Sequence, residues 1–109
     1  MRKLLTISIA IAALAAWSAR AADAKTTFAD QCAKCHGKEG KGDTVMGKRL
    51  GCKDYTDAKV QEELKDDAAF KAIKEGFTTP DGKKVMRAAQ GLSDDDIKGL
   101  VAYMRTLKK

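Results

Sequence analysis

Three residues in one short stretch could do chemistry: the run Cys32-Ala33-Lys34-Cys35-His36 holds two thiols and an imidazole. Thiols three positions apart lie near each other at a helix terminus, and an imidazole is a common metal ligand. At this Cys-x-x-Cys-His pattern the thiols can add to the two vinyl groups of a haem, while the histidine binds the iron. We therefore interpret Cys32 and Cys35 as covalent haem-attachment residues and His36 as the proximal axial ligand.

Other interpretations of the motif fit the sequence less well. A disulfide or thioredoxin-like redox pair between Cys32 and Cys35 is plausible in an exported protein, but the thioredoxin-like fold needs a βαβ frame, which the sequence does not show. A zinc site has suitable ligand types available, although adjacent Cys and His ligands would be strained. Its ligands would be Cys32, Cys35, His36 and Cys52. Chance occurrence of the five residues is the third alternative. Because His36 is the only histidine, a second haem and a haem with two histidine ligands are excluded.

A sixth iron ligand could come from a methionine. Met104 lies on the apolar stripe of a predicted helix, so we assign it to the core. Met86 lies in a non-helical stretch 50 residues after His36, and Met46 lies ten residues after it. Both could reach an iron, and spacing alone leaves Met86, Met46 and an open coordination position as alternatives.

The elements that must position these residues are predicted to be helices. Several stretches show helical spacing and none shows sustained alternation, so we expect an all-α domain. The last helix is the clearest, because Ser93 can cap it and residues 94–96 place three acids on its first turn. Its apolar stripe consists of Ile97, Leu100, Val101, Met104 and Leu107.

Shorter helices are expected upstream. The first runs from about Thr26 to Cys35 and ends where Gly37 permits a turn. Residues 37–54, rich in glycine, are expected to form an irregular loop that a bound cofactor would order. Two further short helices are expected. Thr56 or Asp57 could cap the first, whose apolar positions are Val60 and Leu64. Asp66 or Asp67 could cap the second, which has Phe70 and Ile73 as apolar positions and ends at Gly76.

The first residues have the features of a secretory signal peptide. Arg2 and Lys3 are followed by the uncharged run Leu4–Trp17, and small residues at a cleavage site come next. We expect cleavage after Ala21, with Ala24 as the alternative, which gives a signal peptide at 1–21 and one domain at 22–109. A retained membrane anchor is disfavoured, because a spanning helix needs about 20 apolar residues.

The charge and size of the mature chain limit its function. Three basic residues leave with the signal peptide, so the net charge falls from +6 to +3, and a nucleic-acid partner loses its main support. A domain this small buries only about 60 to 65% of its unfolded surface and commonly needs a cofactor to complete its core.

From Ala24 to its end the chain resembles the class I bacterial monohaem cytochromes c, which have the mitochondrial-type fold. Four motifs match: Cys32-Ala33-Lys34-Cys35-His36-Gly37, Gly40-Lys41-Gly42-Asp43, Lys53-Asp54-Tyr55-Thr56-Asp57, and the Met86 loop with Leu92-Ser93-Asp94-Asp95-Asp96-Ile97 and Leu100-Val101-Ala102-Tyr103-Met104-Arg105. The first of these motifs is highly specific for the family, and the last is moderately specific.

This resemblance implies a fold of three to five helices around one covalently bound haem, in which the N- and C-terminal helices cross. Phe28 would then pack against Leu100, Val101 and Tyr103. The resemblance also implies that Met86 is the distal ligand, although Arg87 follows it where the family often has proline. Near Val45 the family often places a proline whose carbonyl accepts a hydrogen bond from the proximal histidine. A valine carbonyl can accept that bond equally well.

The expected function is that of an exported electron carrier in the periplasm, not an enzyme. It would pass one electron between redox partner proteins of a respiratory chain, a reductase and an oxidase, and would be a monomer without stable membrane insertion. If Met86 does not bind, the alternative is a five-coordinate haem enzyme or a gas or redox sensor. Cys52, left without a partner, would be a small buried hydrophobe or an exposed thiol.

Two sets of side chains could surround the haem. Apolar cover is expected from Leu50, Tyr55, Phe70, Phe77 and Leu92. A basic ring that steers acidic partners, or an ordinary solvated surface, would be formed by Lys34, Lys38, Lys48, Arg49, Lys83, Lys84 and Arg87.

Overall fold

The structure is a computed structural model that describes residues 23–109. The predicted signal peptide at 1–21 lies outside the described residues. The chain begins with a helical run that continues from residue 23 through the π-helical turn η1 (Phe28–Cys32) into α2 (Ala33–His36). The Ala33 amide donates to the Phe28 carbonyl, which is the five-residue step of a π turn. Gly37, with φ of 82°, ends the run as predicted.

The last helix, α6 (Asp94–Thr106), confirms its predicted cap and buried face. The Ser93 hydroxyl accepts a hydrogen bond from the Asp96 amide, and the Asp96 carboxylate accepts one from the Ser93 amide. These reciprocal bonds form a capping box, which satisfies amides that the first turn leaves without partners. The buried residues of α6 are Ile97, Leu100, Val101 and Met104.

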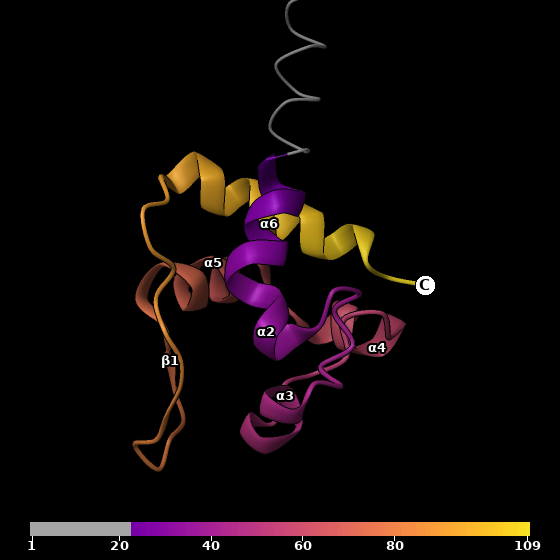
Figure 1. Ribbon diagram of the computed structural model, residues 1–109, viewed down its shortest axis with the longest axis vertical. Helices are drawn as coiled ribbons and strands as arrows, with labels where there is room; N and C mark the ends of the chain where they lie inside the picture. The colour runs from indigo at the N-terminus through magenta and orange to yellow at the C-terminus, as the bar shows by residue number, and fades with distance from the viewer. Residues whose placement is uncertain (1–22) are drawn as a thin grey trace, which may run out of the picture.

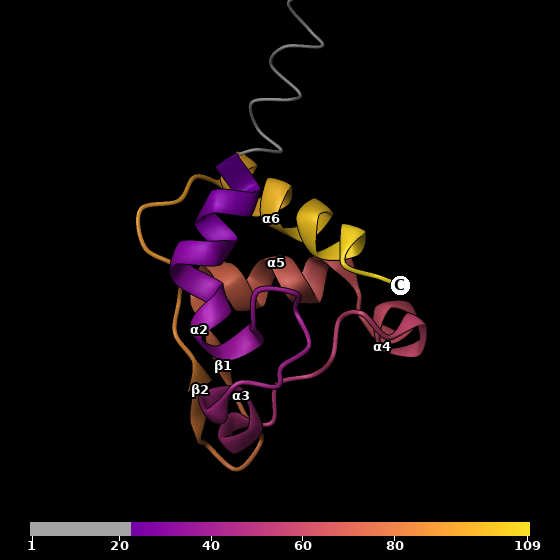
Figure 2. The ribbon, with the colours of Figure 1, turned by 45° about the vertical axis from the view of Figure 1, so that its right-hand side comes forward.

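The core forms where the N-terminal helical run crosses α6, and Figures 1 and 2 show this crossing from two sides. The Phe28 ring lies 5.3 Å from the Tyr103 ring between centroids, and Leu100 is 1% exposed. Helix α5 (Asp66–Glu75) adds Ala69 and Ile73 to the same cluster. The predicted crossing of terminal helices is therefore confirmed.

The middle of the chain is more regular than predicted. A short helix, α3 (Val45–Leu50), interrupts residues 37–54, so the prediction of an irregular loop throughout is wrong. Helix α4 (Ala58–Glu63) is capped by Asp57, as one alternative held. Helix α5 begins after Lys65 instead of after an aspartate, and Asp66 and Asp67 occupy its first turn. Their charges still suit a helix N-terminus.

A small β-hairpin is the other unpredicted element. Strands β1 (Phe77–Thr78) and β2 (Lys84–Met86) pair antiparallel, with Phe77 opposite Met86. With two and three residues, the strands are too short to give an alternating sequence pattern. Figure 1 shows the hairpin extending from one end of α5, away from the crossing of the terminal helices. The domain remains mainly helical.

A polar network joins α4, α5 and α6 on one side of the core. The buried Gln61 side chain donates to the Tyr55 carbonyl at 2.7 Å and to the Met104 carbonyl at 2.8 Å. The Arg105 guanidinium donates to the Gln61 and Leu64 carbonyls, which lie at the end of α4. It also bonds the Asp66 carboxylate at 2.7 Å. Carbonyls that α4 leaves open are thus satisfied by a cation.

No helix among residues 23–109 combines the length and the apolar character needed to cross a membrane.

Candidate haem-attachment site

The motif residues lie together at the end of the N-terminal helical run. Cys32 closes η1 and directly precedes α2, while Cys35 and His36 are its last two residues. All three cysteines of the chain, including Cys52, are free thiols. Burial, and then the neighbouring Cys35 thiol, raise the pKa of the Cys32 thiol to about 11. Two unpaired thiols are therefore available three positions apart at the end of the helical run.

The His36 side chain is half-buried and lies beside two aromatic rings. Its imidazole lies 5.6 Å from the Tyr55 ring and 6.4 Å from the Phe28 ring between centroids. Burial lowers the pKa of His36, so the imidazole is neutral at pH 7 and keeps a lone pair for a metal. Because Phe28 also packs on Tyr103, the histidine is connected directly to the helix crossing.

One ring nitrogen of His36 has no partner. Nδ1 is buried and forms no hydrogen bond with any residue in the described part of the chain. The bond to the Val45 carbonyl that the resemblance implied is therefore not formed. Val45 begins α3 and its side chain is 78% exposed. The formation of α3, which the sequence did not predict, changes the path of the chain at this position.

The backbone around the motif is held by several hydrogen bonds, whereas Nδ1 of the histidine ring has none among the described residues. The Gly37 amide donates to the Ala33 carbonyl at 2.8 Å, and the Gly42 amide donates to the His36 carbonyl at 2.8 Å. The Thr44 hydroxyl donates to the Cys35 carbonyl at 2.7 Å. A residue without a side chain is required where α3 meets α2, because a Cβ on Gly47 would lie 2.3 Å from the Cys35 oxygen.

Tyr55 and Cys52 lie close to the motif residues His36 and Cys35. The Tyr55 amide donates to the Gly40 carbonyl at 2.8 Å, which joins the Tyr55 segment to the loop after His36. Burial, and then Cys52, raise the pKa of the Tyr55 hydroxyl. Burial, and then Cys35, raise the pKa of the Cys52 thiol. Cys52 is half-buried. Its exposure therefore lies between the two predictions, a buried hydrophobe and an exposed thiol.

The three candidate methionines occupy different environments. Met104 is 8% exposed within the core, which confirms its assignment to packing. Met86 is half-buried on β2 and packs against the core cluster that contains Phe28. Met46 is half-buried on α3. The strand that carries Met86 is held close to the end of α5, because a Cβ on Gly76 would lie 2.7 Å from the Met86 carbonyl oxygen.

The side chains expected around the haem divide into two groups. Phe77 is 49% exposed, whereas the other apolar residues, Leu50, Tyr55, Phe70 and Leu92, are half-buried. All seven basic residues, Lys34, Lys38, Lys48, Arg49, Lys83, Lys84 and Arg87, are exposed.

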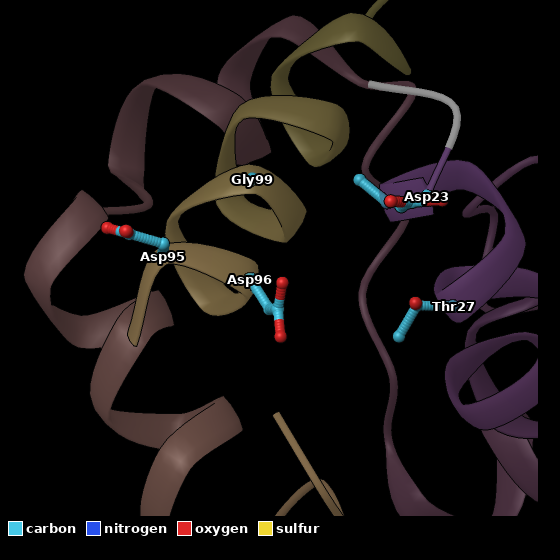
Figure 3. A pocket seen from close by; sticks show the side chains of 6 residues that line it. Asp23, Thr27, Asp95, Asp96 and Gly99 are labelled. Atoms are coloured by element: carbon cyan, nitrogen blue, oxygen red, sulfur yellow. The ribbon is translucent and has the colours of Figure 1, made fainter. Parts of the chain in front are cut away.

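The cavity drawn in Figure 3 is separate from the motif. It lies between the start of the N-terminal helix and α6, and Asp23, Thr27, Asp95, Asp96 and Gly99 line it. Within residues 23–109 no three His, Cys, Asp or Glu side chains converge as a metal site requires. The four residues of the zinc alternative are therefore not arranged as one metal centre.

The side chains at the motif fit a haem bound through two thioethers and one imidazole. Two free thiols precede a half-buried histidine whose pKa is lowered by burial, and its buried Nδ1 has no hydrogen-bond partner among residues 23–109. The family model for cytochrome c matches residues 21–108, which is most of the chain. The chain belongs to the cytochrome c family. It therefore carries a covalently attached haem c with its iron, and its role is that of a haem electron carrier.

Individual relatives of this cytochrome c agree with the family assignment. It is 34% identical over 94 residues to cytochrome c-554(547) of Halothiobacillus neapolitanus, a match covering 81% of this chain and 97% of the relative. Among solved structures it resembles the c-type cytochrome KustC0563, with a TM-score of 0.64 and 30% identity. That match covers 78% of this chain and 96% of the other. The fold is therefore that of a bacterial monohaem cytochrome c.

Two contributors to the site were missed by sequence reasoning. Thr44 follows a glycine-rich stretch and precedes a six-residue helix, so its position as an N-cap is the only signal that could have singled it out. Gln61 is 6% exposed and bonds Tyr55 and Met104, but a glutamine on a short helix looks like a solvent-facing residue. Both bond backbone carbonyls outside their own helices: Thr44 bonds Cys35, and Gln61 bonds Tyr55 and Met104.

Proposed function

We propose that this cytochrome c passes single electrons between redox partner proteins, with its haem bound by four residues. Cys32 and Cys35 would hold the haem covalently, His36 would be the proximal ligand and Met86 the distal one. The observation that supports this assignment is the half-buried imidazole of His36, with its pKa lowered by burial, directly after two unpaired thiols. A haem held by these four residues would have no open position for a substrate and would supply outer-sphere transfer of one electron.

The protein side chains have defined tasks in this proposal. The rings of Phe28 and Tyr55 lie beside the His36 imidazole and limit its movement. Met86 is placed by its strand and by the close approach of Gly76. A thioether ligand favours ferrous iron and raises the potential, and apolar cover acts in the same direction.

The exposed parts of the site support contact with a partner. Phe77 pairs with Met86 in the hairpin and is half exposed, so the chain near the distal ligand reaches the surface. The exposed basic residues near the motif and the hairpin would attract an acidic partner in a salt-dependent manner. We further propose export through a signal peptide cleaved after Ala21 and a monomer in the periplasm, serving a respiratory chain.

The ligand assignment is tested by absorption spectra of the mature protein, oxidised and reduced. A haem spectrum should be present, and the oxidised protein should show the weak red band that reports methionine bound to ferric haem. Met86→Ala should abolish this band while the haem remains attached, and Met46→Ala is the matched control that should retain it.

Each other result has a definite meaning. Loss of the band in Met46→Ala alone would exchange the two methionines. A wild-type haem spectrum without the band would favour the five-coordinate enzyme or sensor. Absence of haem from the wild-type protein, expressed with export and haem-attachment machinery, would contradict the whole proposal.

A further inference from the structure

The connection between Met86 and α6 is bonded to two other parts of the chain at consecutive residues. The Ala89 amide donates to the Ile73 carbonyl at 2.8 Å, which ties the connection to α5. The next residue, Gln90, is bonded to the N-terminal helical run through Gln31. Figure 2 shows the connection passing beside that run on its way to α6. The chain that leaves Met86 is therefore held three and four residues later.

Gln31 forms two hydrogen bonds with the backbone of Gln90. Its side-chain nitrogen donates to the Gln90 carbonyl at 3.2 Å, and its side-chain oxygen accepts from the Gln90 amide at 3.1 Å. A glutamine amide carries both donors and an acceptor, so it can pair with both polar backbone groups of one residue. Only the backbone of Gln90 takes part. The contact therefore does not depend on which side chain stands at position 90.

The position of Gln31 connects this contact to the attachment motif. Gln31 lies in the π-helical turn η1 and directly precedes Cys32. Because the Ala33 amide bonds the Phe28 carbonyl, this turn holds one residue more than an α-helical turn, a departure that is frequent at functional sites. Phe28 is 3% exposed, whereas Gln31 is exposed. The core thus holds the turn from inside, and Gln31 reaches the connection from the outside.

We propose that Gln31 is a positioning residue for Met86. Movement of Met86 away from an iron draws the connection at 87–93 with it, and the two bonds from Gln31 oppose that movement. Because Gln31 and Gln90 are both exposed, water can replace these bonds, and their net contribution is modest. The contact therefore limits how often the methionine leaves, without deciding whether it binds. The inference rests on the proposed ligation by Met86 and adds a residue that holds it in place.

The experiment measures how readily an added ligand replaces the methionine. Imidazole is titrated into the ferric holoprotein, and loss of the methionine band is followed. Imidazole binds once Met86 has left the iron, so its apparent affinity reports the population of that open state. Gln31→Leu removes both hydrogen bonds and should raise the apparent affinity about fivefold, the effect of about one net hydrogen bond. Gln31→Glu keeps the acceptor but loses the donor, and should give a smaller rise.

Two variants are matched controls. Gln90→Ala changes the other residue of the contact but leaves both of its backbone partners in place, so it should bind imidazole as the wild-type protein does. Asp57→Ala removes the cap of α4, and should lower the free energy of unfolding without changing the apparent affinity for imidazole. Hydrogen exchange at the Gln90 amide reports the contact itself, and should be faster in Gln31→Leu than in the wild-type protein.

The outcomes distinguish positioning from stability. Wild-type affinity for imidazole in Gln31→Leu would overturn the proposal, whether or not exchange at the Gln90 amide is faster. An equal rise in affinity in Gln90→Ala or Asp57→Ala would also overturn it, because the effect would then be general loosening of the domain. If Gln31→Leu does not assemble, Gln31→Glu decides by the same comparison. Failure of the proposed ligation is seen separately, as a wild-type protein that has no methionine band to lose.

Discussion

The segment that follows His36 and the strand that carries Met86 differ in how the rest of the chain holds them. Within residues 37–55 the Gly42 amide and the Thr44 hydroxyl bond the last carbonyls of α2, and the Tyr55 amide bonds Gly40. These bonds cross between elements. They hold the end of α2, and with it His36, against the segment that follows.

The segment that carries Met86 is anchored near its ends. The Ala89 amide donates to the Ile73 carbonyl at 2.8 Å, and Gly76 approaches the Met86 carbonyl closely. The tip of the hairpin is bonded within itself, with the Thr79 amide donating to the Lys83 carbonyl and the Gly82 amide to the Thr79 carbonyl. The contrast indicates a rigid histidine side and a more adaptable methionine side.

The largest loss of stability is expected at Gly47, where α3 packs against α2 without space for a side chain. A Cβ on Gly47 would lie 2.3 Å from the Cys35 oxygen and 2.6 Å from the Gly42 oxygen. Both atoms belong to backbone, so Gly47→Ala should lower the free energy of unfolding by about 3 kcal/mol or more, measured by denaturant titration. Gly99→Ala is the control: its Cβ would meet only the Ala24 side chain at 3.8 Å. That helical substitution should stabilise the protein by up to about 1 kcal/mol.

If Gly47→Ala proved harmless, the contact between α2 and α3 would have to be looser than described, and the comparison would fail on its rigid side.

A smaller loss of stability is expected on the adaptable side. Gly76 has φ of 82° and ψ of 175°, a conformation that other residues seldom adopt, and its Cβ would lie 2.7 Å from the Met86 oxygen. Because the strand can move outward, Gly76→Ala should cost about 2 kcal/mol and weaken the methionine band of the ferric protein. Gly82→Ala, also at positive φ but with open space around its Cβ, should leave the band unchanged.

Equal weakening of the band by both glycine variants would assign the effect to backbone strain in general and not to the approach of Gly76 to Met86.

The mildest test requires no substitution. Hydrogen exchange in the native protein should be slower at the Gly42 amide, which bonds the end of α2, than at the Gly82 amide in the hairpin turn. A difference of tenfold or more is expected, on the order of the stability that separates an anchored loop from a local turn. Similar rates at the two amides would contradict the division into rigid and adaptable sides.

Sequence reasoning succeeded where local patterns carry the information. The cap at Ser93 and the apolar stripe of α6 follow from neighbouring residues, and the core confirms them. Helix α4 and the stop at Gly76 were predicted for the same reason. The haem c cofactor and the fold were also predicted, the cofactor from the contiguous Cys-x-x-Cys-His motif.

The prediction failed for elements that depend on contacts between distant segments. Helix α3 has six residues, two of them lysine and arginine, and it forms where Thr44 caps it and α2 packs against Gly47. An isolated helix of that length would not be stable in water. The hairpin strands are equally short, and their pairing depends on where α5 ends.

What the sequence by itself determined is the chemistry available, which is two thiols, one imidazole and a small set of methionines, together with the helices that deliver them. These follow from residue type and short spacing. Only the tertiary structure decided that Nδ1 of His36 finds no hydrogen-bond partner within residues 23–109, that Thr44 and Gly42 bond the carbonyls on its two sides, and that Met86 lies on a strand. The physical reason is that hydrogen bonds to helix-end carbonyls depend on the path of the returning chain, which local spacing does not specify.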